Sequence, residues 1–435
     1  MLRYLLQRVS GSFWFLPTLM TVGAVGLALL MGWVEGADWS QDVRLWSDKL
    51  SLGAEGSRQV VSTVAGAMVT AASLVYSMTL VALTLAAQSA GQRLLQELMG
   101  NRAMQVSLGL FLSTFVYCLL VLRTIVGADG APVPNLSVAA AVLLAIASLV
   151  WLIYFIHSLA GDIQTHSIVA VVTRQLTDAL HREAAPKPAQ SPEPVRCRAG
   201  TGFLVCTDRT GYLETLDEEA IVAAAERSNS QVRMAVRHGD FLSAGDPLAE
   251  CWGGASDELE AAVRKATVIG PRRTAAGDPE YLVHLLVEIA LRALSPGIND
   301  TYTAIACVDH LFGALATVLP RGLRSPVRCD GEGRTRLELY PTHVADLVEE
   351  AFDPIRQAAA GNLPVALRVL EVLDRMAARA GERRSRDAIV LEAELMAAVA
   401  VRHAETDHDR QAVARRLARV RETVDVDDRS ATAAR

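Results

Sequence analysis

Four long apolar runs, separated by polar segments, occupy the first part of this 435-residue chain. They lie at about 13–34, 60–87, 105–126 and 136–159. A helix rises about 1.5 Å per residue, so each run is long enough to cross a hydrocarbon core of about 30 Å. We therefore expect a transmembrane domain over residues 1–160, built from four membrane helices.

A cleaved signal peptide is the alternative interpretation of the first run. The apolar stretch of such a peptide has about 7–15 residues and precedes a small-x-small cleavage site. The run at 13–34 is longer, and no convincing site of that kind follows it. We expect a retained membrane helix.

The pattern changes after residue 160, where charged residues become frequent and apolar runs stop. Four prolines between Pro186 and Pro194 are typical of a linker. Val232, Met234 and Val236 alternate with other residues, which predicts a half-buried strand. We expect a helical extension and proline-rich linker at 161–199, a small β module at 200–252, a helical cytosolic domain at 253–424 and a disordered tail at 425–435.

The second run, from Val60 to Ala87, has no charged residue but is rich in hydroxyl groups. These side chains recur at helical spacing and share one face: Thr63, Thr70, Ser73, Ser77 and Thr84. Such residues are typical of helix–helix contacts, where small side chains let backbones approach. The alternative is the polar lining of a pore formed by several copies of this helix. Both interpretations remain open on the sequence.

Composition narrows the function classes. The chain is 51% hydrophobic and 21% charged, with a net charge of −6 and a pI near 5.9. A general nucleic-acid binder would show a basic face, so we expect no nucleic-acid partner. The six cysteines form no CxxC pair, and five lie after residue 160. We expect reduced thiols in a cytosolic domain.

Five segments carry a resemblance to a known family: FWFLP at 13–17, SMTLVALTLAAQ at 77–88, LGLFLSTFVYCLLVLRT at 108–124, GYLETLD at 211–217 and ALSPGIND at 293–300. Together they resemble the bacterial membrane proteins grouped as domain of unknown function 2254. The likeness covers nearly the whole chain. It implies a multi-pass membrane protein with a soluble C-terminal region and no known activity. The family usually has proline after the Asn-Asp pair, where this chain has Thr301, so we expect a different local turn.

The positions of basic residues predict the orientation. Arg3 and Arg8 precede the first helix, and Arg93 and Arg102 lie between the second and third. The loop between the third and fourth helices has no basic residue. By the positive-inside bias, we expect both termini in the cytoplasm. With the family resemblance, this predicts a multi-pass protein of the bacterial inner (plasma) membrane.

Two groups of polar residues are candidates for gating or for coupling between domains. His157, Asp162 and His166 lie where the fourth helix leaves the membrane; they are interfacial residues or an ion-sensitive gate. Arg292, Asn299 and Asp300 lie in or beside the ALSPGIND segment. That segment is a helix stop followed by a cap, or a loop that binds a ligand or couples the domains.

Catalytic and metal signatures are weak. His284 and Glu288 are four residues apart, so one helix face can present both to a metal. The sequence has no HExxH and no GxSxG motif, and a satisfied histidine in an apolar helix explains the pair better. We predict no catalytic residue, no metal site, no cofactor and no enzymatic activity.

The leading hypothesis is an oligomeric channel or pore in the lipid bilayer, with a cytosolic domain for assembly and regulation. Four helices enclose little space, so conduction requires a homo-oligomer. The alternative is a non-conducting membrane scaffold or sensor whose cytosolic domain binds a partner or small ligand. An ion or a small ligand is the expected additional partner.

Overall fold

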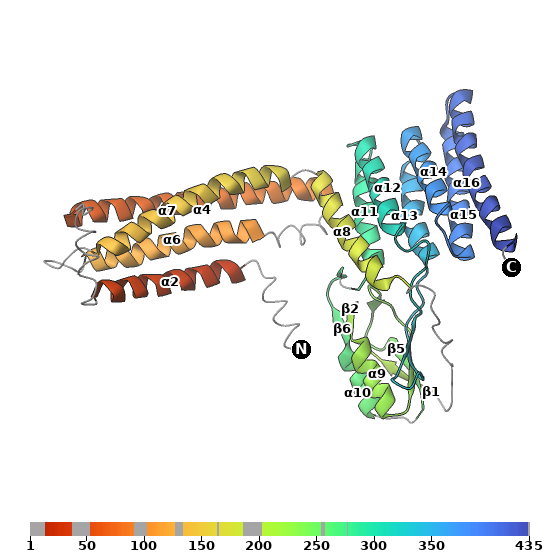
Figure 1. The fold of residues 1–435 in the computed structure, drawn as a ribbon, viewed down its shortest axis with the longest axis horizontal. Coiled ribbons are helices and arrows are strands. Elements are labelled where there is room, and N and C mark those ends of the chain that lie inside the picture. The colour runs from red at the N-terminus through yellow and green to blue at the C-terminus, as the bar shows by residue number, and fades with distance from the viewer. Residues whose placement is uncertain are drawn as a thin grey trace. The chain divides into compact units, whose positions relative to one another are not determined.

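The computed structural model describes residues 14–36, 53–90, 102–126, 134–162, 165–185, 202–253, 257–275 and 277–433. The chain divides into two compact units, Met1–Ser167 and Ile168–Arg435. Helices dominate both, and all strands of the described residues belong to the second unit (Figure 1).

Among its described residues, the first unit has four helices that are each long and apolar enough to cross a membrane. They are α2 (Phe15–Gly36), α4 (Gly53–Ala90), α6 (Arg102–Val126) and α7 (Asn135–Asp162). The fold class predicted from the sequence is therefore confirmed. Helix α4 begins at Gly53, several residues before the apolar run itself, because an amphipathic turn containing Glu55 and Arg58 extends it.

Helix α6 is central in this unit and packs against α2, α4 and α7. Half of its apolar window is buried, against 22% or less in the other three spans. Polar side chains in the interior bond to one another or to the backbone, as they must where water is excluded. Thr114 and Ser148 are 3.2 Å apart through their hydroxyls, and Trp151 Nε1 donates to Ser107 Oγ at 2.9 Å.

Two faces of α4 follow a repeat of about 3.5 residues. The buried face carries Val61, Ala65, Met68, Ala72, Val75 and Ala82. All six belong to the two hydrophobic clusters that α4 forms with the rest of the unit. Small residues on this face allow close contact with α6. The hydroxyl positions are offset by two residues, about 200° around the helix, and so point away from the bundle.

The second unit begins at Ile168, within α8 (Thr165–Glu183), and ends in a two-layer array of six helices. One layer stacks α11, α13 and α15, and the other stacks α12, α14 and α16, with contacts between layers. In Figure 1 these helices stand side by side in chain order. Their bounds are Pro279–Ala293 (α11), Thr301–Leu315 (α12), Val344–Ala358 (α13), Leu363–Ala377 (α14), Arg383–His403 (α15) and Asp407–Ala433 (α16).

Helix α16 continues to Ala433 and so occupies most of 425–435, where the sequence predicts a disordered tail. Val413 and Val420, seven residues apart, are completely buried on the face that packs on α14 and α15. Thr423 Oγ1 donates to Asp374 Oδ1 at 2.7 Å. These anchors, followed by a stretch without proline or glycine, explain why the helix propagates.

Two sheets and two short helices, α9 (Glu218–Arg227) and α10 (Asp257–Ala266), form the β part. The five-stranded sheet has the order β1-β5-β3-β8-β7, and the three-stranded sheet has the order β4-β2-β6. Among the described strands, only β3 and β8 pair in parallel, with Val232 opposite Leu337. The strands are β1 (Gly202–Cys206), β2 (Gly211–Leu216), β3 (Gln231–Met234), β4 (Phe241–Leu242), β5 (Pro247–Trp252), β6 (Thr267–Gly270), β7 (Val327–Cys329) and β8 (Thr335–Glu338).

The β part extends beyond residues 200–252, the bounds that the sequence predicts. Strand β6 and the β7–β8 hairpin come from the region expected to be helical, and each completes a sheet edge or interior. Leu337 is fully buried in the same core as Val205, Leu213 and Ile221. These strands have only three or four residues, too few to show a clear period in the sequence.

Candidate functional site

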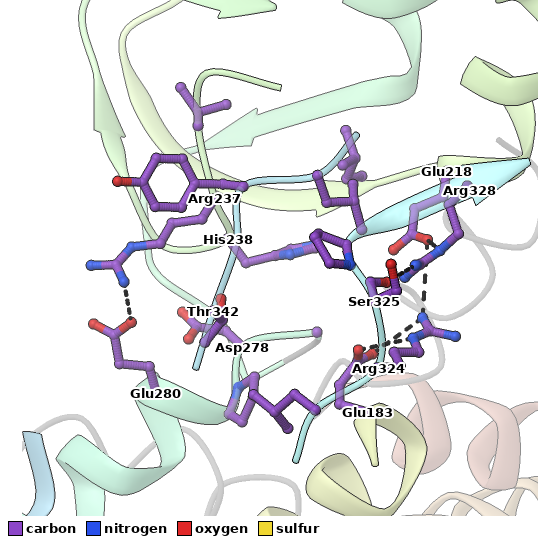
Figure 2. A pocket seen from close by; sticks show the side chains of 18 of the residues that line it. Glu183, Glu218, Arg237, His238, Asp278, Glu280, Arg324, Ser325, Arg328 and Thr342 are labelled. Atoms are coloured by element: carbon purple, nitrogen blue, oxygen red, sulfur yellow. Dashed lines mark hydrogen bonds and ion pairs between the residues drawn. The ribbon is translucent and has the colours of Figure 1, made fainter. Parts of the chain in front are cut away.

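A cavity of about 320 Å³ lies in the second unit, where the end of α8, the β part and the start of α11 meet (Figure 2). Ala184 bridges Leu323 here, so the end of α8 is tied to the segment before β7. The lining combines apolar side chains such as Val236 and Leu339 with charged groups. The polar lining residues are Glu183, Thr215, Glu218, Arg237, His238, Asp278, Glu280, Arg324, Ser325, Arg328, Tyr340 and Thr342.

The charged groups form two separate walls, which Figure 2 shows on opposite sides of the cavity. On one side, Arg237 bonds Glu280 at 3.0 Å. On the other, Arg328 bonds Glu218 at 2.7 Å and Arg324 bonds Glu183 at 3.0 Å. Each wall therefore offers both a cationic and an anionic group to a solute.

The start of α11 fixes the first wall. Asp278 caps this helix by accepting from Tyr281 N at 2.9 Å, and Pro279 occupies the first turn. Both residue types are favoured at these positions. Asp278 is 3% exposed, and Arg273 compensates its charge through Nε at 2.6 Å and the second terminal nitrogen at 3.1 Å. The cap and the ion pair together hold Glu280 at the cavity.

His238 lies between the walls, with Gly277 packed against its ring. Burial lowers its pKa, while the nearby Asp278 carboxylate acts in the opposite direction. A lowered pKa keeps the imidazole neutral at neutral pH. The centre of the cavity therefore carries a neutral donor and acceptor rather than a fourth cation.

His284 belongs to a cluster that adjoins the first wall. Its Nε2 lies 2.6 Å from Oε2 of Glu350 on α13, and its Nδ1 lies 3.4 Å from an Arg273 nitrogen. Glu280, one turn earlier on α11, completes the group. The sequence pairs His284 with Glu288, one turn later; the structure instead brings it together with Glu280 and Glu350.

The ALSPGIND segment connects α11 to α12. Asp300 caps α12 by accepting from Thr303 N at 3.0 Å, and its own N–H donates to Ala293 O at 2.7 Å. Asn299 has φ of 47°, a conformation in which asparagine is common. Arg292 lies in the last turn of α11. Neither Arg292 nor Asn299 nor Asp300 lines the cavity.

Thr301 is the first residue of α12, a position where proline is also favoured. The residue usual in the family would therefore fit the same helix start, and the departure does not require a different turn. Thr301 Oγ1 accepts from Asn362 Nδ2 at 2.7 Å, a contact between α12 and the start of α14 that proline cannot make.

The side chains on the hydroxyl face of α4 are all exposed: Thr63, Thr70, Ser73, Ser77 and Thr84. The threonine hydroxyls bond to their own helix, with Thr63 to Gln59 O at 2.7 Å, Thr70 to Gly66 O at 3.1 Å and Thr84 to Leu80 O at 2.8 Å. His157 is also exposed, whereas the side chains of Asp162 and His166 lie outside the described residues.

The family model for "Predicted membrane protein (DUF2254)" matches residues 10–375. The chain belongs to this family. It is 29% identical over 435 residues to uncharacterized proteins of Mycobacterium tuberculosis (strain H37Rv) and Mycobacterium bovis, a match that covers 97% of this chain and 82% of each relative. No solved structure matches it. Four candidate spans within this family support integration in a membrane.

Sequence reasoning missed most of the cavity. Its three arginines come from two separate places, Arg237 after β3 and both Arg324 and Arg328 around β7, and no motif links them. The Asp278-Pro279-Glu280 segment did carry a signal, because a capping residue followed by proline predicts a helix start. That signal predicts where the first wall begins, but it does not predict which residues lie opposite it in the cavity.

Proposed function

We propose that this protein is a sensor anchored in the bacterial inner membrane, with its second unit in the cytoplasm. The observation that carries the proposal is the cavity with two ion-paired walls and a neutral histidine between them. Its volume is near the lower end of the range typical of small-molecule sites. The ligand it fits is a small zwitterion, with one charged group directed at each wall.

The charges favour a zwitterion over an anion or a cation. The lining has three guanidinium groups and four carboxylates, so a singly charged solute gains from one partner and is repelled by its neighbour. In a molecule with two separated opposite charges, each charged end can bind a group of opposite charge on one of the walls. Its carboxylate would meet Arg324 and Arg328, and its ammonium group would meet Glu280.

Thermal unfolding of the full-length protein in detergent tests this proposal. The probes are L-glutamine as a zwitterion, succinate as a dianion and putrescine as a dication. A ligand that binds only the folded state raises the unfolding temperature. We expect L-glutamine to raise it most in the wild type and in Arg421→Gln, a control that removes an ion pair with Glu394 on the far helices. Arg328→Gln should abolish the rise; an unchanged rise would contradict the assignment, as would no response to L-glutamine.

A homo-oligomeric pore is the second candidate, and the exposed face of α4 favours it. Seven residues at alternating spacings of three and four form a continuous exposed seam: Thr63, Gly66, Thr70, Ser73, Ser77, Leu80 and Thr84. A spacing that averages 3.5 residues suits left-handed packing between copies. Around an axis, the same seam would present hydroxyl groups to water.

Planar-bilayer recording of the purified protein tests the pore. Ser77→Leu should reduce conductance because it adds an apolar side chain to the seam, whereas Val81→Leu, which is exposed but off the seam, should leave it unchanged. Silence of the wild type across ions, voltages and pH would rule the pore out. The sensor would then remain, since solute binding in the second unit needs no conduction.

A further inference from the structure

We propose that Glu280, His284 and Glu350 form a binding site for a divalent transition-metal ion of the zinc class. Glu280 and His284 lie on α11 and Glu350 on α13, two helices that pack directly against each other. One ligand atom from each of the three side chains lies within 4.8 Å of the other two. The proposal goes beyond the sensor function and does not depend on it, although the two share Glu280 of the first wall.

The geometry is close to that of a coordinated ion. For bonds of about 2.1 Å in a tetrahedral site, ligand atoms are about 3.4 Å apart. His284 Nε2 and Glu350 Oε2 are 2.6 Å apart, so this edge must open while the Glu280 carboxylate closes in. Glu280 and His284 are four residues apart and share a helix face, so rotation of their side chains can direct both at one ion.

The net charge around the cluster is suited to a dication. Contacts among the described residues link the cluster to two guanidinium groups, Arg237 and Arg273, and to two further carboxylates, Asp240 and Asp278. With His284 neutral, four carboxylates and two guanidinium groups leave two negative charges. A divalent ion cancels them, and one imidazole with two carboxylates is a donor set that such ions accept.

Arg273 is the group that must give way. Its contacts to the cluster are its longest, 3.4 Å to His284 Nδ1 and 3.5 Å to Glu280 Oε1, whereas its contacts to Asp278 are 2.6 and 3.1 Å. A metal on Nε2 shifts the ring proton to Nδ1, which can no longer accept from Arg273. The guanidinium can withdraw because Asp278 still holds it.

The site is also accessible. The side chains of His284 and Glu350 are 26% and 43% exposed, and that of Glu280 is 12% exposed. An ion can therefore enter from the solvent side, bind the inner carboxylate, and complete its coordination with water. A structural zinc site would be closed, so this arrangement is that of an exchangeable ion.

Titration of the metal-stripped full-length protein in detergent with Zn²⁺, followed by calorimetry, tests the site. The wild type and Glu349→Gln, an exposed neighbour on the same helix, should each bind one ion per chain. Glu350→Gln keeps the shape of the side chain but removes the ligand charge, and should weaken binding about tenfold or more. Equal affinity in the two variants, or no binding in the wild type, overturns the proposal.

Co²⁺ provides the second measurement, because the free thiols include the exposed Cys329. Binding by carboxylates and imidazole gives visible absorption without a sulfur-to-cobalt charge-transfer band. A spectrum in which all the Co²⁺ absorption comes from thiolate coordination would overturn the proposal as well. The unfolding temperature of apo Glu350→Gln shows whether the variant is folded. If it is not, His284→Gln takes its place, with the same expected loss.

Discussion

Arg273 Nε lies 2.6 Å from Asp278 Oδ2, and this buried ion pair packs directly against the backbone of Gly239. Gly239 follows His238 in the cavity and has φ of 85°, and a side-chain carbon there would overlap both charged groups. The turn after β3 and the start of α11 are thus fitted to each other without space between them. The absence of a side chain at Gly239 therefore lets the β part contact the start of the helical array closely at the candidate site.

Gly239→Ala should therefore destabilise the second unit. The left-handed backbone alone costs an ordinary residue about 1–2 kcal/mol, and the overlap with Arg273 and Asp278 adds to that. Gly245→Ala is the matched control, because Gly245 has φ of 99° but no described atom lies within 4 Å of the added carbon. We expect a larger fall in unfolding temperature for Gly239→Ala than for Gly245→Ala. Equal falls would mean that the ion pair moves aside freely.

The two functions of Asp278 can be separated by substitution. Asp278→Asn keeps a capping side chain for α11 but loses the charge paired with Arg273, whereas Asp278→Ala loses both. Both variants leave Arg273, whose side chain is 21% exposed, without its main partner, which costs less than the roughly 3–5 kcal/mol of a fully buried pair; losing the cap costs a further amount of about 1 kcal/mol. Asp278→Ala should be the less stable variant by thermal unfolding. Hydrogen exchange should show that the first turn of α11 opens in the alanine variant but remains protected in the asparagine variant.

The membrane part was predictable because it depends on local composition. A run of apolar residues as long as the one ending at Ala87 has few alternatives to a membrane helix. The side of such a helix that faces the bundle depends less on local sequence and more on packing against the other helices. The hydroxyl period of α4 is visible in the sequence, but it does not say whether Thr70 meets a neighbour in the same chain. That depends on Val61, Ala65 and Met68 packing more closely on the rest of the unit.

The cavity was not predictable for the same reason. Arg328 reaches Glu218 across 110 positions, and Arg324 reaches Glu183 across 141. Those pairs exist only because the β7–β8 hairpin joins β3 in a parallel pairing and Ala184 bridges Leu323. No local pattern specifies either contact. The ALSPGIND connection, by contrast, was foreseen as a stop and a cap, because its contacts lie within a few residues.

That connection allows a further prediction. Asn299 has a positive φ, so Asn299→Gly should retain the stability of the wild type, whereas Asn299→Val should lose about 1–3 kcal/mol. The contrast arises because glycine adopts this conformation freely and a β-branched residue does not. Thermal unfolding measures both. If the loop instead binds a ligand through the Asn299 amide, Asn299→Gly will lose function while its stability is unchanged.

The last prediction concerns pH and a buried carboxyl group on α15. Glu392 is 3% exposed, and its Oε2 has no hydrogen-bond partner among the described residues. Its pKa is raised from 4.5 to about 7, chiefly by burial and also by Asp353 and Glu349 on α13, while Arg356 acts in the opposite direction. The folded protein therefore holds a proton on Glu392 over a pH range in which the unfolded chain has released it.

The sign of the effect follows from this proton. Between about pH 4.5 and 7 the folded state binds more protons than the unfolded state, so this group's contribution to stability is present at low pH and is lost as pH rises through 7. The full difference is at most about 3 kcal/mol. Glu392→Gln keeps the shape without the charge, so it should match the wild type near pH 5 and be more stable at pH 8. Glu394→Gln, a change at a more exposed position on the same helix, should show no such pH-dependent difference in stability from the wild type. Parallel unfolding curves for the wild type and Glu392→Gln across this range would show that Glu392 keeps an ordinary pKa in the folded protein.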